Sequence, residues 1–430
     1  MLDIWYEGRR VGELDSRDRD LVLRYAPEWV ADADSFPLSP RLPLAQAEHV
    51  GEEPLVFVSN LLPEGPLLSA LIKLRRLPKN DVLALMREFG AEVAGAFSIL
   101  PKGEIPSAKG RYVPYPEKTL CADLQAVRDN VPLVSRHEKV RLSLAGAQNK
   151  IAVYVSAVAR PPRDAVMITG GVLMLPADGA ASSHILKPNI QPARDYPQSV
   201  DNEALCLALA SACGLPAARG EIVTACGERV LLIGRYDRAP AEDGRLHRLH
   251  QLDFCQLAGS LPDLKYEEQG GPSLGDVFTL IRQHSAVPSR DVLTAVDWVI
   301  FNYLVGNADA HAKNLAMMPT ARDKFRLASW YDILCTDFYP GLTTKMAMRI
   351  GGENRPDWVR AGNWQRFAAD TGINPSLLRK RFPDLGKPML EALPRVASAL
   401  RIDPDGRLAT HLRKTIAKRL RWSVRTQESL

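Results

Sequence analysis

The chain has 430 residues, of which 46% are apolar and 24% are charged. This composition is ordinary for a globular protein and excludes a largely disordered chain, while the length predicts two or three domains. The net charge of +5 is too small to predict nucleic-acid binding by itself.

No targeting or membrane segment is predicted. The start, MLDIWYEGRRVGELD, has no apolar stretch behind a basic head, so we expect no secretory signal. No run of about 18 apolar residues predicts a membrane span. The cysteines are scattered without a CxxC pair, which argues against a zinc site or a disulfide framework. We therefore expect reduced thiols and a cytoplasmic protein; the cysteines are Cys121, Cys206, Cys213, Cys226, Cys255 and Cys335.

The N-terminal region combines strand and helix patterns. Residues 1–15 predict a hairpin, because LDIWY and RVGEL flank a Glu-Gly turn. NDVLALMREFG (80–90) predicts a helix, since an Asn/Asp cap precedes apolar residues at helical spacing and a glycine follows. PKGEIPSAKGRYVPYP (101–116) is rich in Pro, Gly and Lys and predicts a linker or exposed loop. We place a domain boundary between that segment and residue 136.

The next segment predicts strands around a single lysine. LSLAGAQNKIAVYV (142–155) predicts a strand, a tight turn and a second strand. HILKPNI (184–190) predicts a short strand that carries Lys187 and stops at a proline.

A helix and a hairpin follow. SVDNEALCLALASACGLP (199–216) predicts a helix that Ser199 or Asp201 caps and that Gly214 ends. GEIVTACGERVLLIGRYDR (220–238) predicts a hairpin that turns at Cys226-Gly227.

The remaining sequence is mainly helical in pattern, with one polar interruption. The apolar run 298–305 leads into GNADAHAKNLAMM (306–318), where Asp309 and Asn314 lie five residues apart. A hairpin is then predicted, made of LAMMP, a turn TARDK, and FRLASWYD ending in Asp332. Polar turns are common, but the order of the elements favours a catalytic loop.

That order is the order of a protein kinase. In such enzymes a loop covers the ATP phosphates, a strand lysine holds them, an Asp and an Asn share one loop, and an Asp after a hairpin holds magnesium. Phosphoryl transfer needs these residue types, because cations must offset phosphate charge and a carboxylate must accept the proton of the attacking hydroxyl. The corresponding residues are Lys187, Asp309, Asn314 and Asp332.

The sequence also departs from the eukaryotic kinase pattern. It contains no GxGxxG, H-R-D or D-F-G, and LAGAQNK, with one glycine, would have to cover the phosphates. An ordinary eukaryotic-type kinase is therefore not expected.

Several segments together resemble the HipA family, the serine/threonine-kinase toxins of bacterial toxin–antitoxin pairs, over nearly the whole chain. The most specific are SLAGAQNK (143–150), DAHAKN (309–314) and the Tyr-Asp of WYDI. Further similar segments are RVGEL near the start, NLLPEGP (60–66), VAGAFSILP (93–101), SVDNEA (199–204), RYDR (235–238), KYEEQGGP (265–272), and FYPGL to KMAM (338–348). KYEEQGGP predicts a turn, and the sequence assigns it no chemistry.

The resemblance implies an α+β fold, namely a two-lobed protein-kinase-like fold with an additional N-terminal α/β subdomain and a mostly helical C-terminal lobe. The implied domains are a HipA-type N-terminal subdomain (1–135) and a kinase N-lobe-like subdomain with phosphate loop, lysine strand and hinge (136–238). A helical C-lobe with the catalytic loop (239–430) completes the chain.

The resemblance further implies a toxin that uses ATP and Mg²⁺ to phosphorylate a serine or threonine of a translation protein, typically an aminoacyl-tRNA synthetase. Growth arrest and persistence would follow. The implied partner is a HipB-like helix-turn-helix antitoxin, which ties the toxin to operator DNA and represses transcription. No membrane partner is expected.

The resemblance also assigns roles to residues. Asp309 is implied as the catalytic carboxylate, Asn314 and Asp332 as Mg²⁺ ligands, and Ser143 as the autophosphorylated residue. Family members often carry Glu where this chain has Gly234, so we expect main-chain contacts to adenine there. The implied nucleotide-binding residues are Ala145, Gly146, Ala147, Gln148, Asn149, Lys150, Lys187, Gly234, Arg235, Tyr236, His311, Lys313, Asn314, Tyr331 and Asp332.

Two other functions compete with this interpretation. A catalytically silent co-repressor would use the same fold, but it would be free to lose one of the four kinase residues, and this chain has all of them. A metal hydrolase built on Asp309 and His311 lacks the further ligand spacing of a zinc or two-metal site.

Single residues have simpler explanations too. Lys187 could be a surface lysine of its strand, and His311 could be an ordinary loop histidine. Glu203 either pairs with Lys187 or is simply an acidic first-turn residue that favours the helix N-terminus. The basic clusters 379–381 and 411–425 fit a solvated helix face better than a surface for DNA phosphates.

Overall fold

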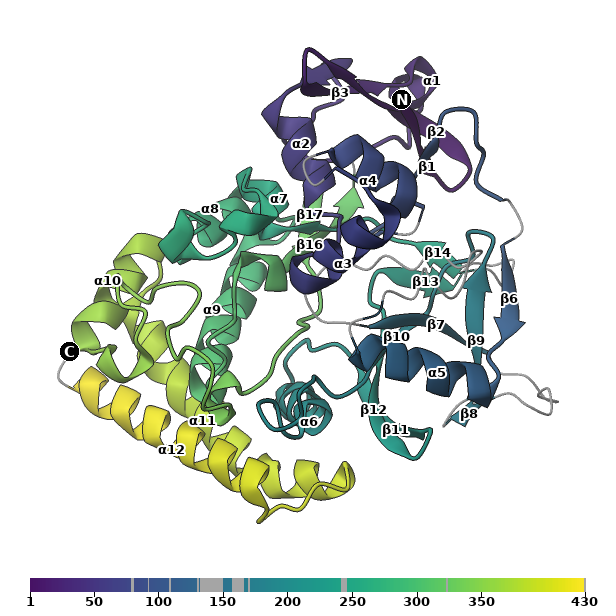
Figure 1. Cartoon of the computed structure of the whole chain (residues 1–430). Helices are drawn as coiled ribbons and strands as arrows, with labels where there is room; N and C mark the ends of the chain where they lie inside the picture. Colours follow the sequence, from purple (N-terminus) through teal and green to yellow (C-terminus); the bar gives the residue numbers. More distant parts are fainter. Residues whose placement is uncertain are drawn as a thin grey trace. The chain divides into compact units, whose positions relative to one another are not determined.

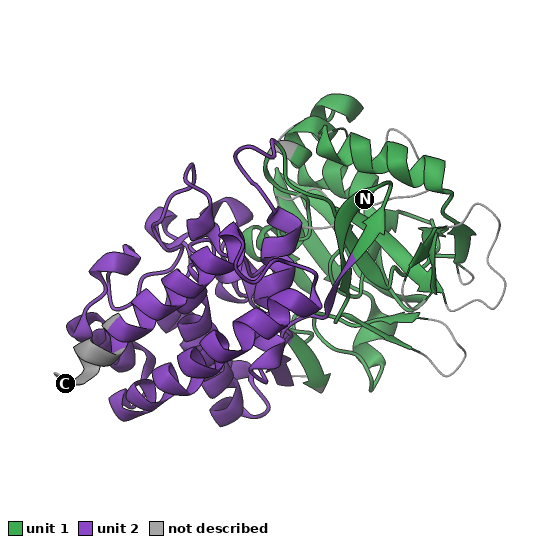
Figure 2. Cartoon of the chain, turned by 90° about the horizontal axis from the view of Figure 1, so that it is seen from below, with its two compact units in different colours: residues 1–191, 223–252, 318–323 green, residues 192–222, 253–317, 324–430 purple. Residues whose placement is uncertain are grey.

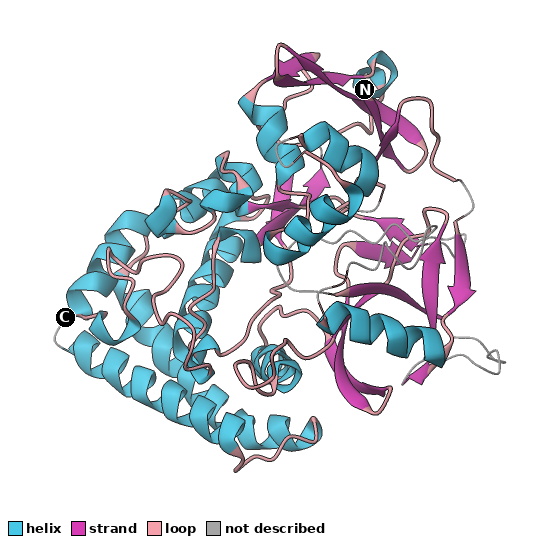
Figure 3. Ribbon diagram, in the orientation of Figure 1, coloured by secondary structure: helices cyan, strands magenta, loops and turns pink. Residues whose placement is uncertain are grey.

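The computed structural model describes residues 1–78, 81–91, 93–107, 110–129, 131, 150–156, 166–168, 171–240, 246–321 and 324–428. The chain forms two compact units (Figure 2). The first unit holds residues 1–191, 223–252 and 318–323, and the second holds 192–222, 253–317 and 324–430. Strands are concentrated in the first unit and helices in the second (Figure 3).

The first unit begins with an antiparallel sheet whose strand order is β4-β3-β2-β1-β5. Its strands β1, β2 and β3 are labelled in Figure 1. Glu7 and Gly8 have φ values of 47° and 78°, the left-handed values of a two-residue hairpin turn, so the predicted hairpin is confirmed. The strands are β1 (Leu2–Tyr6), β2 (Arg9–Arg17), β3 (Asp20–Tyr25), β4 (Glu48–Val50) and β5 (Ser98–Pro101).

Short helices lie between these strands in the chain. They are α1 (Pro27–Ala31), α2 (Glu52–Ser59), α3 (Gly65–Arg75) and α4 (Val82–Phe89). Of these, α1, α2 and α4 pack against the sheet. The predicted helix α4 is confirmed: the Asp81 side chain accepts the N–H of Ala84 across 2.9 Å, and Gly90 ends the helix. A Cβ at Gly90 would lie 2.5 Å from the Met86 carbonyl oxygen and 2.7 Å from that of Ile99, so glycine is required where α4 meets β5.

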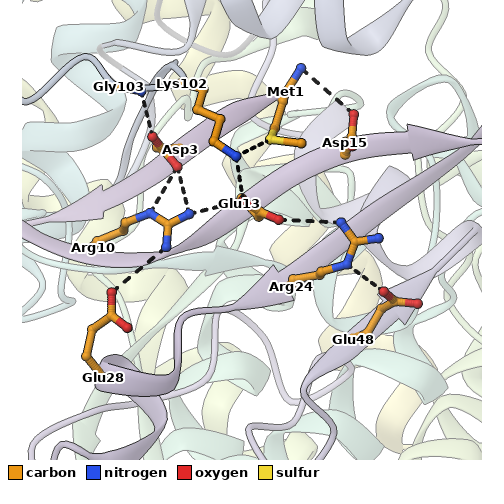
Figure 4. A network of polar contacts seen from close by, with 10 residues as sticks. All are labelled: Met1, Asp3, Arg10, Glu13, Asp15, Arg24, Glu28, Glu48, Lys102 and Gly103. Atoms are coloured by element: carbon orange, nitrogen blue, oxygen red, sulfur yellow. Dashed lines mark hydrogen bonds and ion pairs between the residues drawn. The ribbon is translucent and has the colours of Figure 1, made fainter.

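A network of charged side chains crosses β1, β2 and β3 (Figure 4). Arg10 donates to Asp3 across 3.0 Å and to Glu13 across 3.1 Å, and Arg24 links Glu13 to Glu48. Asp3 is only 4% exposed and also accepts the N–H of Gly103. Most of the other members are partly exposed, so their ion pairs contribute little to stability, whereas the buried Asp3 is held by two donors, Arg10 and Gly103.

The second sheet of this unit has the order β11-β12-β10-β7-β9-β6, with β8 paired to β9. Helix α5 (Glu117–Arg128) packs its apolar face on it, and Leu120, Leu124, Ile151 and Leu173 belong to the shared core. The strands are β6 (Arg111–Pro114), β7 (Ile151–Ser156), β8 (Met167–Ile168), β9 (Gly171–Ala177), β10 (His184–Lys187), β11 (Gly220–Ala225) and β12 (Glu228–Gly234). Residues 101–116, predicted as a linker or loop, therefore include the edge strand β6.

The β11–β12 hairpin turns at Cys226-Gly227, as predicted, with φ values of 55° and 73°. Cys226 forms a disulfide with Cys121 of α5, and their Cα atoms are 5.4 Å apart. The expectation that all thiols are reduced is wrong for this pair. The two cysteines are separated by 105 positions in the sequence, so no local pattern predicts their pairing, which arises because α5 packs beside the hairpin turn.

The second unit is built from helices, with α9 (Pro288–Val305) at its centre and α8, α11 and α12 against it. Twelve residues of α9 are buried. The other helices are α6 (Ser199–Ala212), α7 (Phe254–Ala258), α8 (Leu274–His284), α10 (Ala361–Thr371), α11 (Pro375–Ala399) and α12 (Arg407–Glu428).

Helix α6 starts differently from the prediction. Its N-cap is Gln198, in a left-handed conformation with φ of 55°, and neither Ser199 nor Asp201 caps it. Asp201 instead lies in the first turn, where a negative charge favours the helix dipole. The predicted end is confirmed, because Gly214 is left-handed with φ of 75° and follows the last turn.

Short strands interrupt the mainly helical part after residue 237. β13 (Arg238–Pro240) pairs with β14 (Leu246–Arg248), and a further sheet has the order β15-β16-β17. Its strands are β15 (Leu252–Asp253), β16 (Ala316–Ala321) and β17 (Lys324–Leu327), and β16 and β17 form the hairpin predicted before Asp332. Among the described residues, no helix combines the length and apolarity that a bilayer crossing requires.

Candidate active site

The proposed catalytic loop begins where α9 ends. Gly306 closes the helix with a left-handed φ of 83°, and its N–H bonds back to the carbonyl oxygens of Asn302 and Tyr303. A Cβ at Gly306 would lie 3.0 Å from the Cβ of Asp337, so both conformation and space favour glycine. The apolar helix therefore ends in a sharp turn that leads directly into the polar residues of the loop.

Two side chains fix the main chain around Asp309. Asn307 donates to Oδ1 of Asn302 across 2.8 Å and accepts the N–H of Asp309 across 3.1 Å. The N–H of Ala308 donates to Oγ1 of Thr336 across 2.7 Å. The Asp309 side chain itself is exposed, so a fixed main chain presents an accessible carboxylate.

Asn314 closes the loop on Asp309. Its side-chain amide donates to the carbonyl oxygen of Asp309 across 2.9 Å. The N–H of His311 bonds to the same carbonyl oxygen, and the N–H of Asn314 bonds to that of His311. Residues five apart in the sequence thus share one compact loop, in which Asn314 is buried and Asp309 is exposed.

His311 is a buried, neutral imidazole beside this loop. It is 5% exposed, and its ring packs edge-on against Tyr266 with centroids 5.4 Å apart. Burial, together with the charges of Lys265 and Lys313, lowers the pKa of His311 to about 3, although Asp332 acts in the opposite direction. Its Nδ1 is buried and has no hydrogen-bond partner among the described residues.

Asp332 lies in a strained turn that the second unit holds from two sides. Its φ is 52°, a left-handed value that few residues other than glycine adopt. Two residues earlier, the main chain of Trp330 bonds to Pro216 and Ala218, each across 2.7 Å. Three residues later, Cys335 exchanges two hydrogen bonds with the side chain of the buried Asn202 on α6.

Lys313 and Tyr331, both predicted to contact the nucleotide, are tied to their own unit. The ammonium of Lys313 lies 2.8 Å from a carboxylate oxygen of Asp253, the residue that caps α7. The Tyr331 hydroxyl donates to the carbonyl oxygen of Lys313 across 2.7 Å. These contacts join the catalytic loop to the segment that carries Asp332.

The predicted lysine strand lies inside the second sheet of the first unit. β10 pairs with β7 on one side and with β12 on the other, and Lys187 lies opposite Leu231. Lys187 is 4% exposed, so it is not a surface strand lysine. Lys150 is half-buried just before β7.

The predicted hinge follows β12. Gly234 ends the strand opposite His184, and the Arg235 guanidinium binds Asp237 through two hydrogen bonds. Burial raises the pKa of Asp237, but the charges of Arg235 and Arg238 outweigh this and hold it well below its ordinary value. The Tyr236 hydroxyl donates to Gln251. The side chains of Arg235 and Tyr236 thus make structural contacts within the first unit.

Part of the predicted site lies outside the described residues. Ser143 and the phosphate-loop residues Ala145, Gly146, Ala147, Gln148 and Asn149 belong to this part. Within the described ranges, no group of three or more His, Cys, Asp or Glu side chains could hold a metal ion.

The basic clusters are partly used for packing. Arg381 forms two hydrogen bonds, of 2.7 and 2.6 Å, with Asp297 of α9. Arg419 is 6% exposed and donates to the carbonyl oxygen of Tyr303. Arg381 and Arg419 are therefore used for packing within the unit, whereas the predicted alternative was a solvated helix face.

Sequence reasoning missed three residues that shape the site. Asn202 holds the segment after Asp332, Asp253 pairs with Lys313, and the Tyr266 hydroxyl donates to Oδ1 of Asp309 across 2.7 Å. Asn202 and Tyr266 lie in segments that resemble the family, SVDNEA and KYEEQGGP, but neither segment has a chemical pattern that marks them.

The chain belongs to the HipA family. The model of the HipA N-terminal domain matches residues 2–100, and the model of the HipA-like C-terminal domain matches residues 142–393. The loop of Asp309 and Asn314 and the turn of Asp332 both lie in the second match.

Two relatives and one solved structure show the same likeness. The chain is 38% identical over 405 residues to the kinase-named protein Y4mE of Sinorhizobium fredii, covering 92% of this chain and 91% of that protein. It is 29% identical over 409 residues to the serine/threonine-protein kinase toxin HipA of Shewanella oneidensis, covering 90% and 87%. HipA in the complex of Shewanella oneidensis HipA, HipB and operator DNA superposes with a TM-score of 0.82 at 25% identity, covering 100% and 99%. The α+β fold of HipA is thereby confirmed.

Proposed function

We propose that this protein is a toxin kinase that transfers the γ-phosphate of ATP, with Mg²⁺, to a serine or threonine of another protein. The observation that carries the proposal is the loop in which Asn314 binds the main chain of Asp309 and leaves its carboxylate exposed. The kinase relatives, which match over about nine-tenths of the chain, support it.

The residues of the site are suited to bind the metal ion and the ATP phosphates that this chemistry requires. Asn314 and Asp332 supply oxygen ligands of the kind that Mg²⁺ prefers, and Lys187 supplies a cation for phosphate. The buried Nδ1 of His311 has no partner among the described residues, as expected of an atom beside a ligand site. When bound, Mg·ATP provides the phosphoryl group and offsets the charge on its oxygens.

Within this proposal each residue has a separate task. Asp309 orients the acceptor hydroxyl and accepts its proton, because an exposed carboxylate on a fixed main chain can reach a protein substrate. Asn314 and Asp332 hold the metal, and the neutral His311 adds no positive charge beside it. Lys150 and the hinge main chain at Gly234 contact the phosphates and adenine.

We further propose the biological setting of the family. The acceptor is a translation protein, such as an aminoacyl-tRNA synthetase, and its phosphorylation arrests growth and produces persistence. A HipB-like antitoxin binds the chain and ties it to operator DNA, which is supported by the complex of the Shewanella oneidensis relative. Autophosphorylation at Ser143 switches the kinase off, because the added charge of about −1.5 to −2 repels ATP phosphates.

Induced expression tests this proposal. Cells that make the wild-type chain should stop growing and gain a small set of new phosphoserine or phosphothreonine sites, including Ser143, whereas cells that make Asp309→Asn should show neither effect. Phosphoproteomics of both cultures identifies the acceptor. If operator repression with the antitoxin persists and the two phosphoproteomes are the same, the chain is a silent co-repressor instead.

A further inference from the structure

The segment KYEEQGGP (265–272) carries a tyrosine to the proposed catalytic carboxylate. The Tyr266 hydroxyl donates to Oδ1 of Asp309 across 2.7 Å. The same ring packs edge-on against His311, with an angle of 86° between the ring planes. Tyr266 therefore contacts both ionisable side chains at the start of the catalytic loop.

Glycines determine the shape of this segment. Gly270 is left-handed with φ of 92°, and the N–H of Gly271 bonds to the carbonyl oxygen of Tyr266 across 3.0 Å. A Cβ at Gly271 would lie 2.1 Å from the carbonyl oxygen of Leu264, so only glycine permits the chain to fold back here. This tight turn holds Tyr266 at its base.

One main-chain segment fixes the spacing between Tyr266 and Asp309. Ala347 donates its N–H to the carbonyl oxygen of Ala308 across 2.8 Å and accepts the N–H of Glu267 across 3.0 Å. It is thus bonded to the neighbours of both residues. The Glu267 carboxylate also accepts the N–H of Arg349 across 2.6 Å. Because the main chain of Ala347 is hydrogen-bonded to both loops, the second unit holds Tyr266 and Asp309 at a fixed separation.

We propose that Tyr266 is a positioning residue for phosphoryl transfer. Its hydroxyl fixes the rotation of the Asp309 carboxylate, so that this group meets the acceptor hydroxyl in one orientation. The proposal rests on the proposed kinase function and assigns a task to KYEEQGGP.

The substitution Tyr266→Phe tests the contact, since it keeps the ring against His311 and removes only the hydroxyl. The assay measures, at several ATP concentrations, the rate of phosphate transfer from labelled Mg·ATP onto the full chain and its rate of ATP hydrolysis. The matched control is Tyr303→Phe, which removes a hydroxyl bonded to the Pro356 carbonyl oxygen in the same unit.

Tyr266→Phe should lower kcat about tenfold or more, because a misoriented catalytic group is costly, and should leave the KM for ATP unchanged. Tyr303→Phe should change neither. A purely structural role would change the melting temperature but would not lower kcat while the KM for ATP stays the same.

Three outcomes would overturn the inference. An unchanged kcat in Tyr266→Phe would show that the hydroxyl has no role in transfer. A faster Tyr266→Phe enzyme would show that the hydroxyl blocks the acceptor position. In both cases the wild type is active, and the proposed function stands. If the wild type neither hydrolyses ATP nor transfers phosphate, the proposed function itself fails, and this inference fails with it.

Discussion

The side chain of Asn202 binds both polar main-chain groups of Cys335: its Oδ1 accepts the N–H across 2.8 Å, and its Nδ2 donates to the carbonyl oxygen across 3.0 Å. Asn202 is fully buried on α6, whereas Cys335 lies three residues after Asp332. This pair therefore anchors the turn that presents the proposed metal ligand.

Asn202→Ala should damage magnesium-dependent nucleotide binding as well as stability. The substitution leaves the N–H of Cys335 without its acceptor and leaves the Cys335 carbonyl oxygen with only the N–H of Phe338, 3.3 Å away, which should cost about 2 kcal/mol in the free energy of unfolding. The turn of Asp332 should loosen, so that the Kd for Mg·ATP rises. Calorimetric titration and chemical denaturation measure the two effects. Asn60→Ala, which alters a buried asparagine of the first unit, is the control. If both variants bound Mg·ATP equally well, Asn202 would have only a structural role.

The buried His250 should make stability depend on pH. Burial lowers its pKa to about 4, opposed by its bond to the Leu38 carbonyl oxygen. As the pH falls below the ordinary histidine pKa of about 6.5, His250 becomes protonated in the unfolded chain but stays neutral in the folded chain. The free energy of unfolding is therefore full above about pH 6.5 and falls as the pH drops from there towards 4.

His250→Gln, which keeps a donor for the same carbonyl group, should reduce the slope of stability between about pH 7 and 5. Denaturation curves at several pH values measure this slope. The control is His247→Gln, at a partly exposed position beside Glu7. Equal slopes in the wild type and His250→Gln would contradict the assignment.

The disulfide between Cys121 and Cys226 predicts a thiol count. Cys206, Cys213, Cys255 and Cys335 are free, so protein purified without reductant and then denatured should expose four thiols, and reduced protein six. Cys121→Ser should lower the melting temperature of the oxidised protein, because a cross-link constrains the unfolded chain by about 2–4 kcal/mol. It should not change that of the reduced protein. Six thiols in both samples would show that the pair stays open.

Local patterns predicted the elements whose cause is local. The turns at Glu7-Gly8 and Cys226-Gly227 each place two consecutive residues in left-handed conformations. The capped helix α4 and the helix end at Gly214 follow from cap residues and glycine. Asp309 and Asn314 are five residues apart, which predicts that they share one loop, and a hydrogen bond from the Asn314 side chain to the Asp309 carbonyl oxygen closes that loop.

Contacts between distant segments were not predictable in the same way. Tyr266 reaches Asp309 through a turn and a bridging main-chain segment, and Asn202 reaches Cys335 across 133 residues. The cap of α6 also differs, because Gln198 adopts a left-handed conformation that the sequence around Ser199 does not signal. These features depend on how distant segments pack together, and local sequence patterns do not predict such packing.

The central claim is that Asp309 performs transfer whereas Asp332 holds the metal. The most direct measurement compares Mg·ATP affinity and the phosphate-transfer rate in Asp309→Ala and Asp332→Ala. Asp309→Ala should keep nearly normal affinity and lose transfer, because its carboxylate acts on the acceptor hydroxyl. Asp332→Ala should lose both, because a charged metal ligand is gone. Equally poor Mg·ATP binding in the two variants, or a wild type without kinase or ATPase activity, would contradict this division of roles.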